Sequence, residues 1–125
     1  MKALMLGALA AAMLPAPAQA QSDANWRPVR TQDGMVFALD VNSVKTVGGL
    51  RHFRIRTTFV DPKKTAVGYF DNAANCPAMT VDTLYGEVSD KGVTLRKQAM
   101  KPGEMRNRLD DEQGKLIYPL VCGTQ

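Results

Sequence analysis

The clearest alternation of apolar and polar positions lies between Leu50 and Phe59. The apolar set is Phe53, Ile55, Thr57 and Phe59, and the polar set is His52, Arg54, Arg56 and Thr58. Successive side chains of a strand point to opposite faces of its sheet. The pattern therefore predicts a strand whose apolar face packs on a core and whose basic face meets water.

Further strands are predicted on both sides of this one. Turn signals separate them at Gln32-Asp33-Gly34, Gly48-Gly49, Asp61-Pro62-Lys63-Lys64 and Ser89-Asp90-Lys91-Gly92. The predicted strands cover residues 26–30, 35–39, 66–70, 79–88 and 93–98. Pro28 places the first at an edge of the sheet, because proline has no amide to donate. Alternation along 79–88 places Tyr85 on the same face as Val81 and Thr83.

Two segments between the strands lack this alternation. Residues 40–44 are rich in Asp, Asn and Ser, whose side chains bond to nearby backbone, and we expect a tight helical turn there. Residues 72–77 predict an irregular segment that holds the first cysteine. If these two segments are not strands, the strands next to them end earlier.

The C-terminal region predicts the one helix. Residues 104–112 are polar enough for a solvated loop or a helix start, and residues 115–122 are apolar. Asp110, Asp111 and Glu112 suit a helix N-terminus, and Pro119 predicts a kink. The fold class is therefore α+β: a five- to six-stranded antiparallel sheet with one C-terminal helix packed on it.

Residues 1–20 have the pattern of a cleavable secretory signal. Lys2 is followed by an apolar run, and Ala18-Gln19-Ala20 predicts cleavage after Ala20. The apolar run is shorter than the roughly 20 residues of a membrane span, and no cysteine near the cut provides a lipid anchor. We expect a periplasmic or secreted protein with no membrane span or lipid anchor, consisting of one domain over residues 21–125.

The chain has two cysteines, Cys76 and Cys122. An even number of cysteines in an exported chain usually forms disulfides, so we expect one intramolecular bridge between them. Closing a loop of this length would stabilise the fold by about 4 kcal/mol in the chain-entropy model. The alternative is a reactive or metal-binding thiol pair. It lacks a CxxC spacing, and the only histidine, His52, is remote in sequence.

Basic residues are concentrated in the first half of the mature chain. Loss of Lys2 lowers the net charge from +4 to +3, and eight basic residues face three acidic ones between positions 27 and 64. Guanidinium groups bind sulfate, phosphate and carboxylate well. The predicted ligand-binding residues are therefore Arg51, His52, Arg54, Arg56, Lys63 and Lys64. The alternative is that this row is only the solvated face of an antiparallel sheet.

Residues for catalysis or for a cofactor are not evident. His52 stands alone, and Asp110 to Glu112 lack the alternating ligands and the glycine of a calcium loop. No serine has a G-x-S-x-G context, and Gly48-Gly49 is a turn and not a phosphate loop. We expect no catalytic residue, no metal and no cofactor. Export and the lack of a helix-in-groove motif argue against a nucleic-acid partner.

The order of several features resembles a known family. They are Trp26, Asp40-x-x-Ser43-Val44, the strand with alternating arginines, Asn75-Cys76, the Tyr85…Asp90-x-Gly92 hairpin and Val121-Cys122. Together they resemble the surface-adhesin E family of small exported bacterial proteins, typified by Haemophilus adhesin protein E. The resemblance covers nearly all of the mature chain. It implies an antiparallel sheet with a packed helix, a Cys76–Cys122 bridge and, in the type member, dimerisation and binding of vitronectin and laminin.

Two functions without catalysis follow from these expectations. The first is an exported binding module that contacts an extracellular matrix protein or an acidic, sulfated polysaccharide through the basic strand. The alternative is a periplasmic accessory or structural protein that binds another envelope component through a sheet edge or the helix. A homodimer through edge strands is compatible with both.

Overall fold

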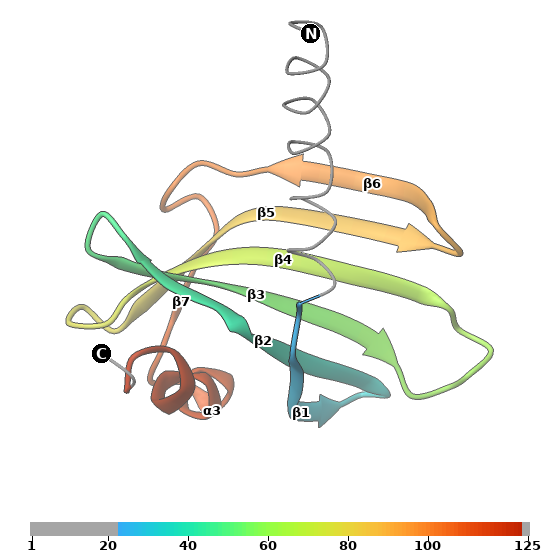
Figure 1. Cartoon of the computed structure of the whole chain (residues 1–125), viewed down its shortest axis with the longest axis horizontal. Coiled ribbons are helices and arrows are strands. Elements are labelled where there is room, and N and C mark those ends of the chain that lie inside the picture. Colours follow the sequence, from blue (N-terminus) through green and yellow to red (C-terminus); the bar gives the residue numbers. More distant parts are fainter. Residues whose placement is uncertain (1–22, 124–125) are drawn as a thin grey trace, which may run out of the picture.

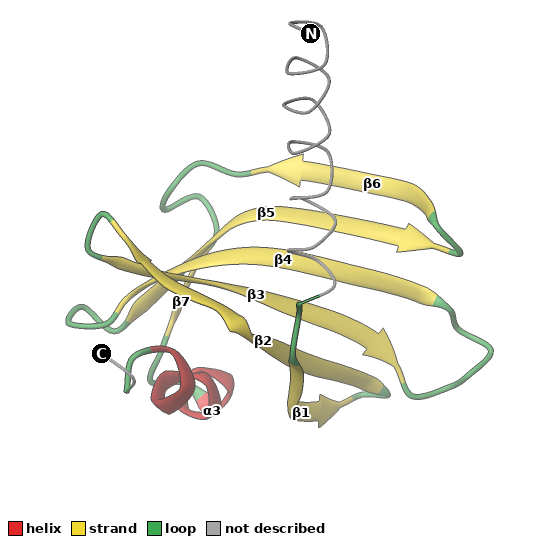
Figure 2. Cartoon of the chain, viewed as in Figure 1, coloured by secondary structure: helices red, strands yellow, loops and turns green. Residues whose placement is uncertain are grey.

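The computed structural model describes residues 23–123, so the predicted signal at residues 1–20 lies outside the described residues. Six antiparallel strands follow one another across a single sheet in the order β1-β2-β3-β4-β5-β6 (Figure 1). Their bounds are β1 Trp26–Gln32, β2 Met35–Val47, β3 Leu50–Phe59, β4 Ala66–Asn75, β5 Thr80–Asp90 and β6 Val93–Ala99. A short strand, β7 (Arg106–Arg108), also pairs with β5, and the helix α3 (Glu112–Val121) follows it (Figure 2).

These elements confirm the predicted α+β class with an antiparallel sheet and one C-terminal helix. Strand β3 has the bounds that the alternation predicted. Strand β7 was not predicted, because residues 104–112 looked like a loop or a helix start. Its three residues are all exposed, so they have no apolar alternation that could reveal a strand.

The predicted helical turn at residues 40–44 is wrong, because β2 continues to Val47 through an irregularity between Asp40 and Lys45. The expected side-chain to backbone bonds do occur there. The Asp40 carboxylate accepts from the Asn42 amide at 3.0 Å, and the Ser43 hydroxyl donates to the Asp40 carbonyl at 2.6 Å. Ser43 also accepts from the Arg54 amide of β3 at 2.8 Å. These bonds bridge a β-bulge and do not close a helical turn.

The predicted irregular segment at 72–77 is also shorter than expected, because β4 runs to Asn75. The register shifts inside this pairing, where Asp71 faces Tyr85 but Asn72 faces Thr83. Leu84 is thus the extra residue of a bulge. Tyr85 moves to the opposite face from Thr83, contrary to the predicted alternation.

The core lies between one face of the sheet and α3. The fully buried side chains are Leu39 from β2, Leu109 before the helix and Val121 at its end. Phe53 and Ile55 of β3 are buried in the same cluster, together with Ile117 of α3. The predicted apolar face of β3 therefore packs on the helix side.

The helix begins earlier than predicted, at Glu112. The Asp111 side chain caps it by accepting from the Gly114 amide at 2.6 Å, as the acidic run predicted. The helix continues through Pro119 to Val121. A disulfide then joins Cys122 to Cys76 at the end of β4, with a Cα–Cα distance of 5.8 Å. The expected bridge is confirmed. Within residues 23–123, no helix is long and apolar enough to cross a membrane.

Candidate functional site

The face of the sheet opposite α3 contains the predicted basic row. Asp40, Arg54, Asp71 and Tyr85 lie directly opposite one another across β2 to β5, and Trp26 of β1 faces Asp40. Side chains of directly opposed residues share one face of a sheet. We call this surface the open face and define it by these five residues. It carries acids on both sides of the arginine row, which the sequence pattern did not indicate.

Arg54 forms an ion pair with Asp71. Arg54 Nε lies 2.8 Å from Asp71 Oδ1 and Nη2 lies 3.4 Å from Oδ2, and the two side chains are 39% and 41% exposed. The hydrogen bond to Asp71 raises the pKa of Arg54 above its usual value. The positive charge of Arg54 is therefore compensated on the protein itself, although the pair remains accessible to a ligand.

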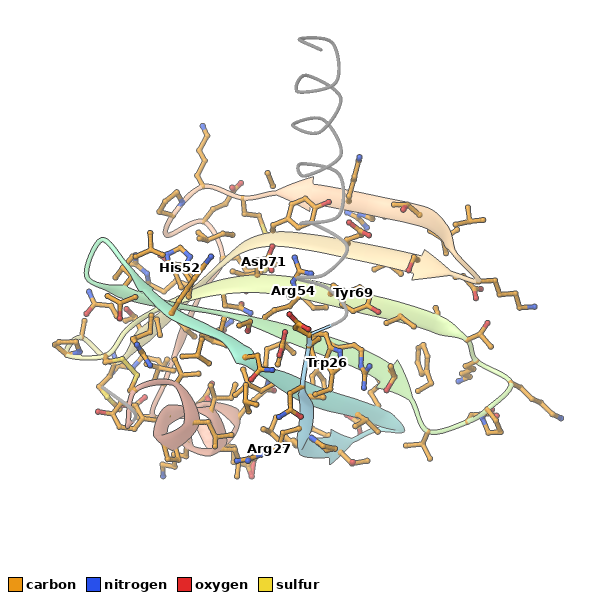
Figure 3. The ribbon with its side chains drawn as sticks, viewed as in Figure 1. Trp26, Arg27, His52, Arg54, Tyr69 and Asp71 are labelled. Atoms are coloured by element: carbon orange, nitrogen blue, oxygen red, sulfur yellow. A yellow bond between two sulfur atoms is a disulfide. The ribbon has the colours of Figure 1, made fainter. Side chains whose placement is uncertain are left out.

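Arg56 is covered by Trp26. The Arg56 Cζ lies 4.7 Å from the centre of the Trp26 ring, and among the described residues its buried Nε has no hydrogen-bond partner. The Trp26 ring also lies 5.9 Å from the ring of Tyr69 at an angle of 50°. Because Trp26 belongs to β1 and Tyr69 to β4, the indole extends over β2 and β3. Figure 3 shows Arg54, Asp71 and Tyr69 near one another, with Arg27 apart from them.

A depression of about 1020 Å³ lies on the open face. Its lining includes Trp26, Lys45, His52, Arg54, Tyr69 and Tyr85. Four acidic residues also line it, namely Asp23, Asp40, Asp71 and Glu87. The acids outnumber Lys45 and Arg54 two to one, so the depression favours a neutral or positively charged ligand surface over a polyanion.

The structure separates the six predicted ligand-binding residues. His52 and Arg54 line the depression, whereas Arg56 lies beneath Trp26. Arg51 faces the helix side, where its Nε donates to the Val121 carbonyl at 2.8 Å. The exposed Lys63 and Lys64 lie in the turn after β3, where Lys64 Nζ lies 5.4 Å from the Phe59 ring centre. That turn is about 23 Å from His52 along the strand, at about 3.3 Å per residue.

The aromatic residues of the depression were missed in the sequence. Tyr69 and Asp71 stand two residues apart, as do Tyr85 and Glu87, and this spacing is the signal that could have indicated a shared face. The Tyr85 hydroxyl donates to Glu87 Oε1 at 2.9 Å, and this bond raises the pKa of Tyr85. Both tyrosines and Glu87 are half-buried, so their polar ends are oriented and still accessible.

No family model, curated protein or solved structure matches the chain. The resemblance to the surface-adhesin E family therefore remains a prediction from its motifs. The part of the chain that the structure describes also contains no group of three His, Cys, Asp or Glu side chains placed to hold a metal ion. What supports a function is the geometry of the open face.

Asp82, next to the open face, is paired with Arg106, and this pair predicts how the stability of the fold depends on pH. Asp82 Oδ1 accepts from Arg106 Nε at 2.7 Å, and Oδ2 accepts from Arg106 Nη2 at 3.0 Å and from the Gly103 amide at 3.1 Å. The bonds to Arg106 hold the pKa of Asp82 below its usual value. The carboxylate therefore stabilises the fold above about pH 4, and this contribution is lost as the pH falls through the lowered pKa.

We expect Asp82→Asn to lower the free energy of unfolding at pH 7 by about 0.2–1 kcal/mol, the usual range for a partly exposed pair. The deficit should shrink as the pH falls below about 4 and through the lowered pKa of Asp82. Urea unfolding of both proteins at pH 7, 5 and 3 measures this difference. A deficit that is equally large at pH 3 would show that the charge of Asp82 is not the cause.

Proposed function

We propose that this protein is an exported binding module that recognises another protein through the open face. The observation that supports this is the half-exposed group of Trp26, Tyr69, Tyr85 and Arg54 around one depression. Trp, Tyr and Arg are the residue types enriched among the side chains that dominate protein–protein binding energies. They combine large apolar contact area with oriented polar ends.

The disulfide supports the exported location. Cys76 and Cys122 are both buried and bonded to each other, and the described residues contain no free cysteine. Stable disulfides of this kind are typical of secreted and periplasmic proteins and rare in reducing compartments. The partner is therefore an extracellular or envelope protein.

An acidic or sulfated polysaccharide fits the open face less well than a protein does. The charge of Arg54 is already paired with Asp71, Arg56 is covered, and Lys63 and Lys64 lie in a distant turn. A polyanion entering the depression would also approach four carboxylates. A protein surface that presents both charges and apolar groups avoids this repulsion.

A second candidate is a periplasmic accessory or structural protein, and the edge strand β6 favours it. Within the described sheet β6 pairs only with β5, and all its residues are exposed, including Val93 and Leu95 at 62% and 61%. An extended segment of an envelope partner could add to such an edge. Arg96 and Lys97 on the strand oppose pairing with a second copy and favour an acidic partner strand.

The first candidate is tested with residues 21–125 on immobilised vitronectin, laminin and heparin across a salt series. We expect binding to a matrix protein and a roughly 30-fold loss of affinity with Trp26→Ala, as for a central interface residue. Arg54→Ala should weaken the same binding. Lys63→Ala, in the exposed turn, is the matched control and should bind like the wild type.

Two outcomes would redirect the proposal. Wild-type affinity in Trp26→Ala would remove the open face as the binding surface. Heparin binding that falls with salt and is lost in Lys63→Ala/Lys64→Ala would show instead that a polyanion binds through the turn. Absence of binding to all three ligands would favour the envelope partner.

A further inference from the structure

A cavity of about 320 Å³ lies on the other side of the sheet, between its strands and α3. Three of the four phenylalanines of the chain line it, namely Phe37, Phe53 and Phe70. Ile55 and Val81 of the sheet, Met105 and Leu109 before α3, and Ile117 of α3 add to its apolar wall. Polar side chains line it between the sheet and the helix, namely Asn107, Arg108, Asp111 and Gln113. We call this space the helix-side cavity. Its volume lies at the lower end of the range for small-molecule sites, which are mostly apolar with a few placed polar groups.

On strands β3 to β5, one polar side chain of the cavity wall lacks a protein partner. The Thr57 side chain is 7% exposed and lines the cavity, and among the described residues no group bonds to its hydroxyl. The neighbouring polar side chains, Asn72 and Thr83, do have hydrogen-bond partners within the protein. Asn72 Oδ1 accepts from the Thr83 hydroxyl at 2.8 Å, and Asn72 Nδ2 donates to the Phe70 carbonyl at 3.1 Å. The only fully buried side-chain polar atom without a partner among the described residues is Arg56 Nε, so the Thr57 oxygen is still accessible. A ligand group that enters the cavity can therefore bond to it.

Contacts with backbone atoms hold one side chain of the cavity wall, Phe70, in place. The Phe70 ring packs directly against Gly68 and Gly86. A Cβ at Gly68 would lie only 2.9 Å from the ring, and one at Gly86 only 3.1 Å from it. Outside the cavity lining, the disulfide attaches the C-terminal end of α3 to the end of β4. The sheet wall of the cavity is therefore held by packing against backbone, and residues of the segment 105–111 before α3 line another side of it.

We propose that the helix-side cavity binds a small, neutral and mainly apolar molecule with one hydroxyl or carbonyl group. Phenylalanine rings and isoleucine side chains provide the apolar contact, and the Thr57 hydroxyl bonds to the single polar group. The proposal is independent of the open face, since alternate residues of β3 point to opposite sides of the sheet. Either site can fail without the other.

The sequence provides a direct readout for this test. The chain has two isoleucines, Ile55 and Ile117, and both line the cavity. Its single tryptophan, Trp26, lies on the open face. In a sample labelled at isoleucine methyl groups and at nitrogen, the two methyl signals report the cavity and the indole N–H reports the open face.

The probes are p-cresol and toluene, which differ by one hydroxyl. We expect both to shift the two isoleucine signals in a saturable way and to leave the indole signal unchanged. p-Cresol should bind about fivefold more tightly, as one neutral hydrogen bond allows. Thr57→Val should remove this preference and retain toluene binding. Val81→Leu, which adds a methylene at the cavity wall, should weaken both probes and serves as a second variant if Thr57→Val does not fold.

Three results would overturn the proposal. The first is the lack of saturable isoleucine shifts with either probe at millimolar concentration. The second is a p-cresol preference that persists in Thr57→Val, because the hydroxyl would then be bound elsewhere. A shift of the Trp26 signal in place of the isoleucine signals would also place the probe on the wrong face.

Discussion

Replacing Cys76 and Cys122 with alanine should lower the free energy of unfolding by about 4 kcal/mol. The bridge spans 46 positions in the sequence, and the chain-entropy model gives this figure for a loop of that length. Small exported domains typically lose about 2–5 kcal/mol when a native disulfide is removed. A protein of this size has only one modest core, so a loss of this size is a large part of its stability.

The position of the bridge explains why other contacts replace little of the stability that is lost when the bridge is removed. It attaches the C-terminal end of α3 to the end of β4, and both cysteines are buried in the core cluster. Near this end, Arg51 also bonds to the Val121 carbonyl at 2.8 Å. One hydrogen bond from a charged donor contributes about 1.5–3 kcal/mol, less than the bridge. Without the disulfide, the helix should detach from the sheet before the strands separate.

Urea unfolding of the wild type and of the double alanine variant measures this effect. The wild type with a reductant should unfold like the variant, which separates loss of the bridge from loss of the side chains. The variant itself should not respond to the reductant. A difference below about 1 kcal/mol between the oxidised and reduced wild type would show that the bridge is not a main source of stability.

Local patterns predicted most of the sheet. The alternation along β3 fixed its bounds, and the tight turns were marked by residues suited to their backbone. Gly48 and Gly49 have φ values of 57° and 83° in the turn between β2 and β3, a conformation that glycine adopts at little cost. These features depend on neighbouring residues alone, so one sequence is enough to find them.

The candidate site depends on strand register, which a single sequence does not encode locally. Arg54 meets Asp71 because β3 and β4 pair with these residues opposite each other, 17 positions apart. Tyr85 reaches the same face only because the bulge at Leu84 reverses the alternation. Trp26 covers Arg56 from across the sheet. The alternation thus placed His52, Arg54 and Arg56 on one face of β3, while the groups around them were not predictable.

Replacing Gly114 with alanine should lower the free energy of unfolding by about 3 kcal/mol, at the upper end of the usual cost of overpacking. A Cβ at this position would lie 2.5 Å from the Cα, the carbonyl carbon and the oxygen of Leu109. These are backbone atoms and cannot rotate away. Leu109 is itself 1% exposed, so the segment before α3 has no room to shift outward. The clash exceeds the gain of about 1 kcal/mol that alanine brings to a helix.

Gly68→Ala is the matched control, because its Cβ would be too close only to the end of the Phe70 ring, at 2.9 Å and 3.3 Å, and would make an ordinary contact with Thr57 Cβ at 3.8 Å. A ring can tilt by a few tenths of an ångström, so the loss there should be about 1 kcal/mol. Urea unfolding ranks the two variants, and the isoleucine methyl signals show where each acts. Gly114→Ala should shift Ile117 most, since the helix must move off the sheet. If Gly114→Ala were as stable as the wild type, the close contact between α3 and Leu109 would not hold the helix in place, and the walls of the helix-side cavity would be less fixed than we infer.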